Sequence, residues 1–304
     1  MAFVGIDTVV FSAPDMKQAR RFFVDWGVRR VRDGRAGAVF ETEIGSQVVL
    51  RPPAAGGLPP AAPGANFREV IWGVSSTRDL ETIAGELSRD REVTLDKDGT
   101  LHSVDPNGLG IGFRVWRRKR ALKPSRTPVN TPGALERIDA PSRFYRRASP
   151  LRMGHVVFLV PDVGAGERFY TKRLGFWLSD RYTGGVGVFL RYVANSDHHN
   201  LFLLRSREAR TAIDHVAFEV RDIHEVFGGG LYMQRRGWPT EVGPGRHPIS
   251  SAYFWYFKSP CGGSVEYFGD SDYLTEAWKP TAYRANRFSE WHLAAGIESV
   301  QRGA

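Results

Sequence analysis

The chain has 304 residues, 42% hydrophobic and 25% charged, with a formal net charge of +9. This length suffices for two domains with buried cores, and the composition excludes a disordered or fibrous protein. A single cysteine, Cys261, excludes an internal disulfide framework. No apolar run approaches the roughly 18 residues that cross a membrane, and the N-terminal residues do not resemble a signal peptide. We therefore expect a soluble, cytoplasmic protein without a membrane partner.

The positive charge is confined to residues 117–152, which hold eleven Arg or Lys and two acidic side chains. The rest of the chain is therefore neutral overall. The segment is interrupted by prolines and has few aromatic residues, whereas a surface for nucleic acid combines basic groups with stacking aromatics. We interpret it as a solvated linker, with a contact between subunits as the alternative, and we expect no nucleic-acid partner.

The first half begins with an apolar run of strand length that ends at a Pro-Asp pair. A helical pattern follows and stops at Gly27. Residues 68–74 form a second strand-like run, and residues 77–90 a second helical pattern. Residues 108–116 are predicted as the last strand of this half. The order is strand, helix, strands, and then the same again.

The second half repeats this order. Residues 8–23 and 155–170 align without a gap and share Val-Val-Phe, Pro-Asp and Arg-Phe-aromatic matches, so one structural unit occurs twice, about 147 residues apart. A helix is predicted to end at Gly175, with short β-rich runs after it. The later elements of this half are predicted as a strand over 213–220, a helix over 222–237, and strands over 252–257 and 263–269.

Each half thus consists of two β-α-β-β-β modules, which gives an α+β protein of four modules paired into two domains. This arrangement resembles the vicinal oxygen chelate superfamily, and within it the two-domain type I extradiol ring-cleavage dioxygenases. The resemblance covers roughly residues 5–116 and 152–270. It implies that each pair of modules curves its sheet into an incomplete barrel around a cavity.

Three residues occupy corresponding strand positions and match the metal ligands of the family. His155 and His215 lie near the starts of two strands, and Glu266 lies on the last strand. Two imidazoles and one carboxylate leave coordination positions open, which suits non-haem Fe(II) and O2 chemistry, and Mn(II) accepts the same ligands. Taken singly, each His could be structural and the Glu a surface residue. Their joint position favours the metal site.

The repeat pairs these three residues with Thr8, Glu69 and Gly112 in the first half. We therefore expect an N-terminal domain without metal ligands over residues 1–118. A basic linker is expected over 119–150, a catalytic metal-binding domain over 151–285, and a C-terminal tail over 286–304.

Three further residues match the family by spacing. The resemblance implies that His199 is the acid/base, and that His247 and Tyr256 surround the substrate oxygens and O2. Each could instead be structural: His199 as a solvent-facing imidazole, His247 as an ordinary loop residue, and Tyr256 as a core aromatic. The family often has an acid at the position that Ser250 occupies here, so this chain departs from the family pattern at that position. Cavity-lining candidates are Phe189, Tyr192, Phe202 and Trp255.

The expected function is Fe(II)-dependent opening of a catechol-type ring next to its diol, with insertion of both atoms of O2. Trihydroxylated rings are among the candidate substrates. The partners are then a small aromatic diol and O2, and we expect a homo-oligomer. The alternatives are a glyoxalase-type isomerase or lyase, a thiol transferase, and a non-enzymatic binder of small molecules on the same fold.

Overall fold

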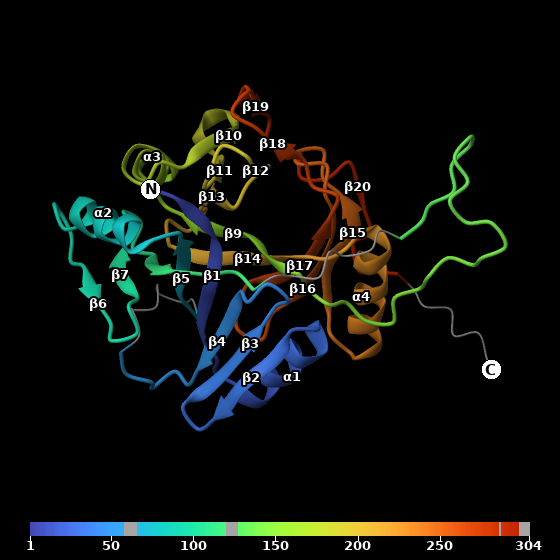
Figure 1. The fold of residues 1–304 in the computed structure, drawn as a ribbon, viewed down its shortest axis with the longest axis horizontal. Coiled ribbons are helices and arrows are strands. Elements are labelled where there is room, and N and C mark those ends of the chain that lie inside the picture. The colour runs from blue at the N-terminus through green and yellow to red at the C-terminus, as the bar shows by residue number, and fades with distance from the viewer. Residues whose placement is uncertain (58–65, 120–126, 286, 298–304) are drawn as a thin grey trace.

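A computed structural model describes residues 1–57, 66–119, 127–285 and 287–297 (Figure 1). The first half forms an eight-stranded sheet in the order β2-β3-β4-β1-β5-β8-β7-β6. Its elements are β1 (Phe3–Ser12), α1 (Met16–Trp26), β2 (Arg29–Gly34), β3 (Gly37–Glu41), β4 (Gln47–Arg51), β5 (Phe67–Val74), α2 (Thr77–Leu87), β6 (Thr94–Leu95), β7 (Leu101–Val104) and β8 (Gly110–Val115).

The second half forms a ten-stranded sheet in the order β19-β10-β11-β13-β9-β14-β17-β16-β15-β20. Its elements are β9 (Arg152–Val160), α3 (Val163–Arg168), the π-helical turn η1 (Phe169–Arg173), β10 (Trp177–Tyr182), the 3-10 turn η2 (Thr183–Gly185), β11 (Gly187–Arg191), β12 (Ser196–Asp197), β13 (Leu201–Arg205), β14 (Ala212–Glu219), α4 (Ile223–Arg235), β15 (Thr240–Arg246), β16 (Tyr253–Lys258), β17 (Ser264–Gly269), β18 (Tyr273–Leu274), β19 (Thr281–Tyr283) and β20 (Trp291–His292).

The two sheets share one plan. In each, an antiparallel central pair (β1 with β5, β9 with β14) is flanked by a parallel neighbour on either side. One helix follows the first strand of each module, so the β-α-β-β-β order occurs four times. The predicted α+β fold of four paired modules is confirmed.

The helix ends follow the local sequence. The side chain of Asp15 accepts a hydrogen bond from the backbone N–H of Gln18 and so begins α1, and Gly27 ends it in the left-handed region with φ of 103°. The corresponding helix of the second half differs from the prediction. There α3 is short and continues as the π-helical turn η1, in which Phe169 and Tyr170 are both buried. Glycines at 164 and 166 weaken the α-helix, and tertiary burial of two successive aromatics favours the wider turn.

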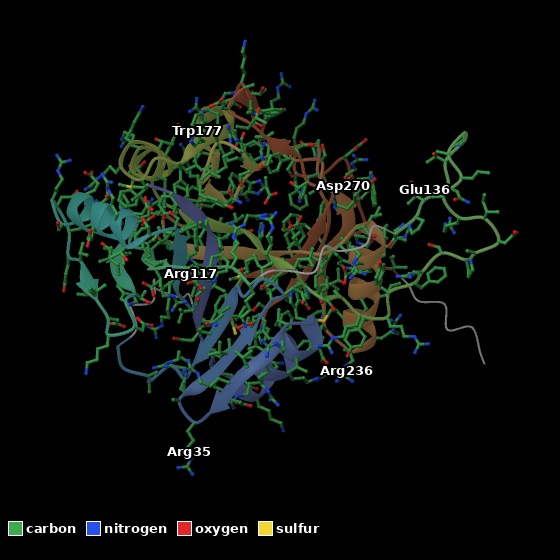
Figure 2. All side chains as sticks on the ribbon, viewed as in Figure 1. Arg35, Arg117, Glu136, Trp177, Arg236 and Asp270 are labelled. Atoms are coloured by element: carbon green, nitrogen blue, oxygen red, sulfur yellow. The ribbon has the colours of Figure 1, made fainter. Side chains whose placement is uncertain are left out.

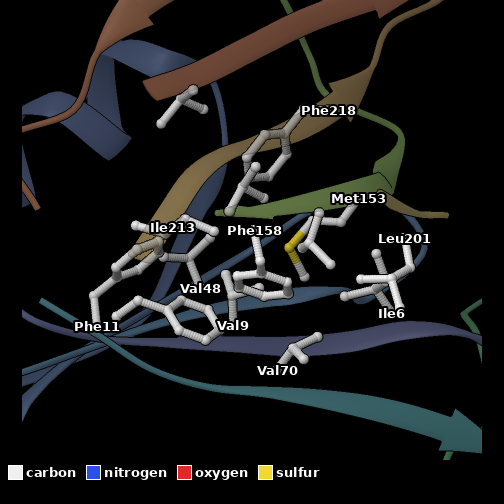
Figure 3. Packing of buried hydrophobic residues seen from close by; sticks show 14 of the residues in the cluster. Ile6, Val9, Phe11, Val48, Val70, Met153, Phe158, Leu201, Ile213 and Phe218 are labelled. Carbon is white, nitrogen blue, oxygen red and sulfur yellow. The ribbon is translucent and has the colours of Figure 1, made fainter. Parts of the chain in front are cut away.

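The two halves share one hydrophobic core. Ile6, Val9 and Val70 of the first sheet pack in the same cluster as Phe158 and other residues of the second (Figure 3). On another side of this core, Trp26 at the end of α1 stacks on Tyr267 of β17, with ring centroids 3.6 Å apart. The hydroxyl of Tyr267 donates a hydrogen bond to the carbonyl of Trp26. These contacts hold the two sheets together.

Residues 127–150 of the predicted linker have little regular structure. The stretch around Glu136 projects away from both sheets (Figure 2), and Leu135, Ile138 and Phe144 are exposed. Within the described residues 287–297 of the predicted tail, β20 pairs with Gly245 and Arg246 at the edge of β15. No helix in the described part of the chain is long and apolar enough to span a bilayer.

Candidate metal centre

Strand register brings His155, His215 and Glu266 together. They lie on β9, β14 and β17, which are adjacent in the sheet. Ala217 of β14 pairs with His155 on one side and with Glu266 on the other. His215 lies two residues before Ala217, and residues two apart on a strand share a face. All three side chains therefore point to the same side of the sheet.

The three ligand atoms form a nearly regular triangle. The Nε2 atoms of His155 and His215 are 3.2 Å apart. Oε2 of Glu266 lies 3.1 Å from Nε2 of His155 and 3.3 Å from Nε2 of His215. Atoms that bind one ion at about 2.1 Å and at right angles to each other lie about 3 Å apart. The triangle fits one face of an octahedral ion and leaves the opposite face open.

Glu266 places a buried negative charge in this triangle, which suits a bound cation. Its side chain is fully buried, and neither carboxylate oxygen has a hydrogen-bond partner among the described residues. The imidazole nitrogens lie near Oε2 without the alignment of a hydrogen bond. Burying an unpartnered carboxylate costs several kcal/mol at the order-of-magnitude level, and a divalent cation removes that cost. The residues present therefore fit a metal ion.

Asp214, the residue before His215, orients the His215 imidazole. Its Nδ1 lies 2.6 Å from Oδ1 of Asp214, so Nε2 is left to face the other two residues. Burial lowers the pKa of His215, but Asp214 and Glu266 outweigh that effect and raise the pKa to about 9. A carboxylate bonded to the outer nitrogen of a ligating histidine fixes the orientation of the ring and makes the inner nitrogen more basic.

His247 and Tyr256 form a hydrogen-bonded pair beside this triangle. Nδ1 of His247 donates to the carbonyl of Phe288 at 2.7 Å, because a carbonyl can only accept. Its Nε2 therefore accepts from the hydroxyl of Tyr256 at 3.1 Å, and it lies 3.7 Å from Oε1 of Glu266. Burial and the charge of Glu266 raise the pKa of Tyr256, so its hydroxyl keeps its proton.

His199 lies beside His155, in the turn between β12 and β13. Its side chain is buried, and its ring centroid lies 4.2 Å from that of His155. Burial lowers the pKa of His199 well below its usual value, and the neighbouring His155 and His198 lower it further. The imidazole of His199 is therefore neutral and keeps one nitrogen lone pair. The alternative of a solvent-facing imidazole is wrong.

One cavity is shared by the two ligand histidines, His199, His247 and Tyr256, and Glu266 is not among its lining residues. Its walls include His155, His199, His215, His247 and Tyr256. The other lining residues are mainly apolar or aromatic, and they comprise Val157, Tyr182, Phe189, Phe202, Ile249, Ser250, Ala252, Ser271, Arg287 and Phe288.

The predicted cavity lining is half correct. Phe189 and Phe202 line the cavity, whereas Tyr192 and Trp255 do not. Trp255 alternates with Tyr256 on β16, so it faces the other side of the sheet and packs on Gly230 of α4. Arg287 and Phe288 were missed, because nothing in their local sequence shows that the chain returns across the cavity after β19.

The first half holds a different arrangement at the equivalent place. Thr8 pairs with Ile71, and Ile71 pairs with Gly112, as His155, Ala217 and Glu266 do in the second half. Glu69 is buried there, and its Oε1 accepts from Nδ1 of His102 at 2.7 Å. The carboxylate of Glu69 therefore has a hydrogen-bond donor in the His102 side chain.

Comparison with known proteins agrees with this geometry. Residues 152–267 match the model of the Glyoxalase/Bleomycin resistance protein/Dioxygenase superfamily. The predicted resemblance is therefore confirmed at the level of the superfamily.

Among curated relatives, metapyrocatechase 2 of Cupriavidus necator is 37% identical over 178 residues. The alignment covers 57% of this chain, and it spans 54%, about half, of that relative's length. The structure of the Mn(II)-bound glyoxalase from Novosphingobium aromaticivorans has a TM-score of 0.74 and 19% identity, with 97% of this chain and 92% of that chain covered. That of BphC, a halotolerant catechol dioxygenase, has a TM-score of 0.72 and 18% identity, with 95% and 94% covered. These two structures show the fold alone.

Proposed function

We propose that this protein is an Fe(II)-dependent extradiol dioxygenase, which inserts both atoms of O2 into a catechol-type ring and opens the ring next to the diol. The observation that carries the proposal is the triangle of His155, His215 and Glu266 at the base of an aromatic-lined cavity. The 37% identity to a metapyrocatechase supports the same substrate class. Mn(II) is the alternative metal, because both ions accept two imidazoles and one carboxylate.

In this proposal the metal, when bound by His155, His215 and Glu266, supplies open positions for diol and O2 and acidifies the diol hydroxyls. His199 accepts a proton from a hydroxyl of the diol and returns it later in the reaction. On substrate binding, the Tyr256 hydroxyl would exchange its hydrogen bond to His247 for one donated to the negative charge that develops on the substrate oxygens. The freed Nε2 of His247 would accept a hydrogen bond from a substrate hydroxyl. Phe189 and Phe202 form an apolar wall for the aromatic ring.

The test begins with metal-free protein that is loaded anaerobically with Fe(II) or Mn(II). Catechol, substituted catechols and trihydroxybenzenes are then added, air is admitted, and O2 uptake is recorded. We expect one O2 consumed for each ring opened, with a yellow product from catechols. Metal-loaded protein that consumes no O2 with any diol contradicts the proposal. Turnover of the hemithioacetal of methylglyoxal and glutathione without O2 would instead support the glyoxalase-type alternative, which the similar fold of a glyoxalase keeps open.

His199→Ala tests the proposed acid/base. We expect the variant to bind the metal as the wild type does, while kcat falls by about 10²–10⁴-fold. His224→Ala is a suitable control, because His224 lies on α4 and does not line the cavity. Full activity of His199→Ala would remove the role assigned to His199. The cytoplasmic location, the homo-oligomeric assembly and the division into domains belong to the same proposal.

A further inference from the structure

A line of buried polar side chains leads to the cavity from β10, the strand next to the edge strand β19 of the second sheet. Asp180 lies on β10, and His198 and His199 lie in the turn before β13. The Oδ2 atom of Asp180 is 2.7 Å from Nε2 of His198. Nδ1 of His198 is 3.1 Å from Nδ1 of His199. Asp180 and His198 are each 1% exposed, so water does not compete for these contacts.

The direction of each hydrogen bond follows from the carboxylate. Oδ1 of Asp180 accepts from the backbone N–H of Thr281 on β19. An ionised carboxylate can only accept, so the hydrogen between Asp180 and His198 is on Nε2 of His198. A neutral His198 then has a lone pair on Nδ1. The contact between the two histidines is favourable only if Nδ1 of His199 carries the proton and donates it.

We propose that Asp180 and His198 are positioning residues that hold His199 in its Nδ1–H tautomer, with the unprotonated Nε2 facing the cavity. No hydrogen bond from the described residues reaches Nε2 of His199, and its ring lines the cavity wall. The catalytic use of this tautomer rests on the proposed function. In the reaction, the O–H bond of a bound diol breaks and an N–H bond forms at Nε2 of His199.

The same arrangement stabilises His199 after it has taken the proton. The imidazolium keeps its Nδ1–H donated to His198, and the charge of Asp180 lies one residue further along the line. This is the logic by which a buried carboxylate orients a catalytic histidine in hydrolases, here with one extra imidazole between the two groups.

The surroundings keep the line dry and fixed. Phe189 contacts both rings, with centroids 5.4 Å from His198 and 5.2 Å from His199. The indole of Trp278 lies against His198 and donates its Nε1–H to the carbonyl of Ser179. Trp278 precedes β19, so the chain after β17 covers the outer end of the line.

The tautomers are measured directly by long-range ¹H–¹⁵N correlation spectra of full-length protein labelled with ¹⁵N-histidine. Spectra are recorded on metal-free protein and on protein loaded with Zn(II), which is diamagnetic. We expect the proton of His198 on Nε2 and that of His199 on Nδ1. A doubly protonated His198, or a neutral His199 with its proton on Nε2, would overturn the proposal. The wild-type spectra give this answer without any variant.

Asp180→Asn is the isosteric variant that should reverse the direction of each hydrogen bond between residue 180, His198 and His199. The amide oxygen keeps the hydrogen bond from Thr281, so the NH2 group faces His198 as a donor. His198 must then accept on Nε2 and donate from Nδ1, and the proton of His199 moves to Nε2. We expect inverted tautomers and a kcat lower by about 10²–10⁴-fold, with KM little changed. Unchanged tautomers in a folded Asp180→Asn protein would also overturn the proposal.

Asp197→Asn is the matched control. Asp197 precedes His198 directly, but its carboxylate pairs with Arg152 and not with either histidine. The variant removes one negative charge next to His198, as Asp180→Asn does. It should leave the tautomers of both histidines and kcat as in the wild type. The spectra require no substrate, so they test the tautomers independently of the reaction. Protein that has the expected tautomers but takes up no O2 would contradict the proposed function and leave this inference intact.

Discussion

Asp214→Asn should weaken metal binding through the orientation of His215. In a regular strand, neighbouring side chains point to opposite faces and cannot meet. Here β14 has a bulge. Ile213 and His215, two residues apart on β14, pair with Phe158 and Val157, which are adjacent on β9. Asp214 is the extra residue, and a bulge re-aims the side chains beside it. Its Oδ1 thereby reaches Nδ1 of His215 at 2.6 Å.

The size of the effect follows from the exposure of this contact. Removing a group that orients a metal ligand costs about 10–100-fold in metal affinity. The side chain of Asp214 is 40% exposed, so solvent screens part of its charge. Asparagine can still accept a hydrogen bond at the same place. We therefore expect a loss near the lower limit, about tenfold, which corresponds to about 1.4 kcal/mol.

The assay is calorimetric titration of metal-free protein with Mn(II), repeated anaerobically with Fe(II). Glu241→Gln is the control, because Glu241 lines the same outer pocket as Asp214 and His215 without a hydrogen bond to His215 among the described residues. It removes an equal charge at a similar place. Equal affinity of Asp214→Asn and the wild type would refute this reasoning. An equal loss in both variants would show that charge near the site matters, and not the hydrogen bond.

Three other predictions use the same protein. Saturating Mn(II) at about 100 times its Kd should stabilise the wild type by about 2.7 kcal/mol in thermal unfolding, and Glu266→Gln should lose this increase, so an equal shift in both would contradict the site. Trp26→Ala should lower the free energy of unfolding in urea by about 3–5 kcal/mol while both sheets still unfold in one transition, because Trp26 stacks on Tyr267 across the halves; separate transitions would contradict the shared core. Burial raises the pKa of Asp105 from 3.8 to about 6, so the folded protein retains a proton that the unfolded chain releases. The free energy of unfolding should therefore fall by up to about 3 kcal/mol as pH rises through this range, and Asp105→Asn should reduce that slope; an unchanged slope would disprove the assignment.

The sequence alone determined the module order and the grouping of the central residues. The repeat of strand, helix and strands is local, and the two-residue period of a strand assigns each side chain to a face. Alignment of the repeat also paired His155 with Thr8 and Glu266 with Gly112, and the register of the two sheets agrees. These features depend on short-range order, which the pattern of apolar residues carries.

The tertiary structure decided which groups meet. The line from Asp180 to His199 depends on β10 and the turn before β13 lying together, and no local pattern specifies that distance. Trp255, a candidate for the cavity lining, lies on the other face of β16, and Phe288 was not predicted because it reaches the cavity only when the chain returns over it after β19. Side-chain periodicity fixes direction along one strand. Contacts between segments far apart in the chain depend on strand pairing and loop paths, which are set when the whole core is packed.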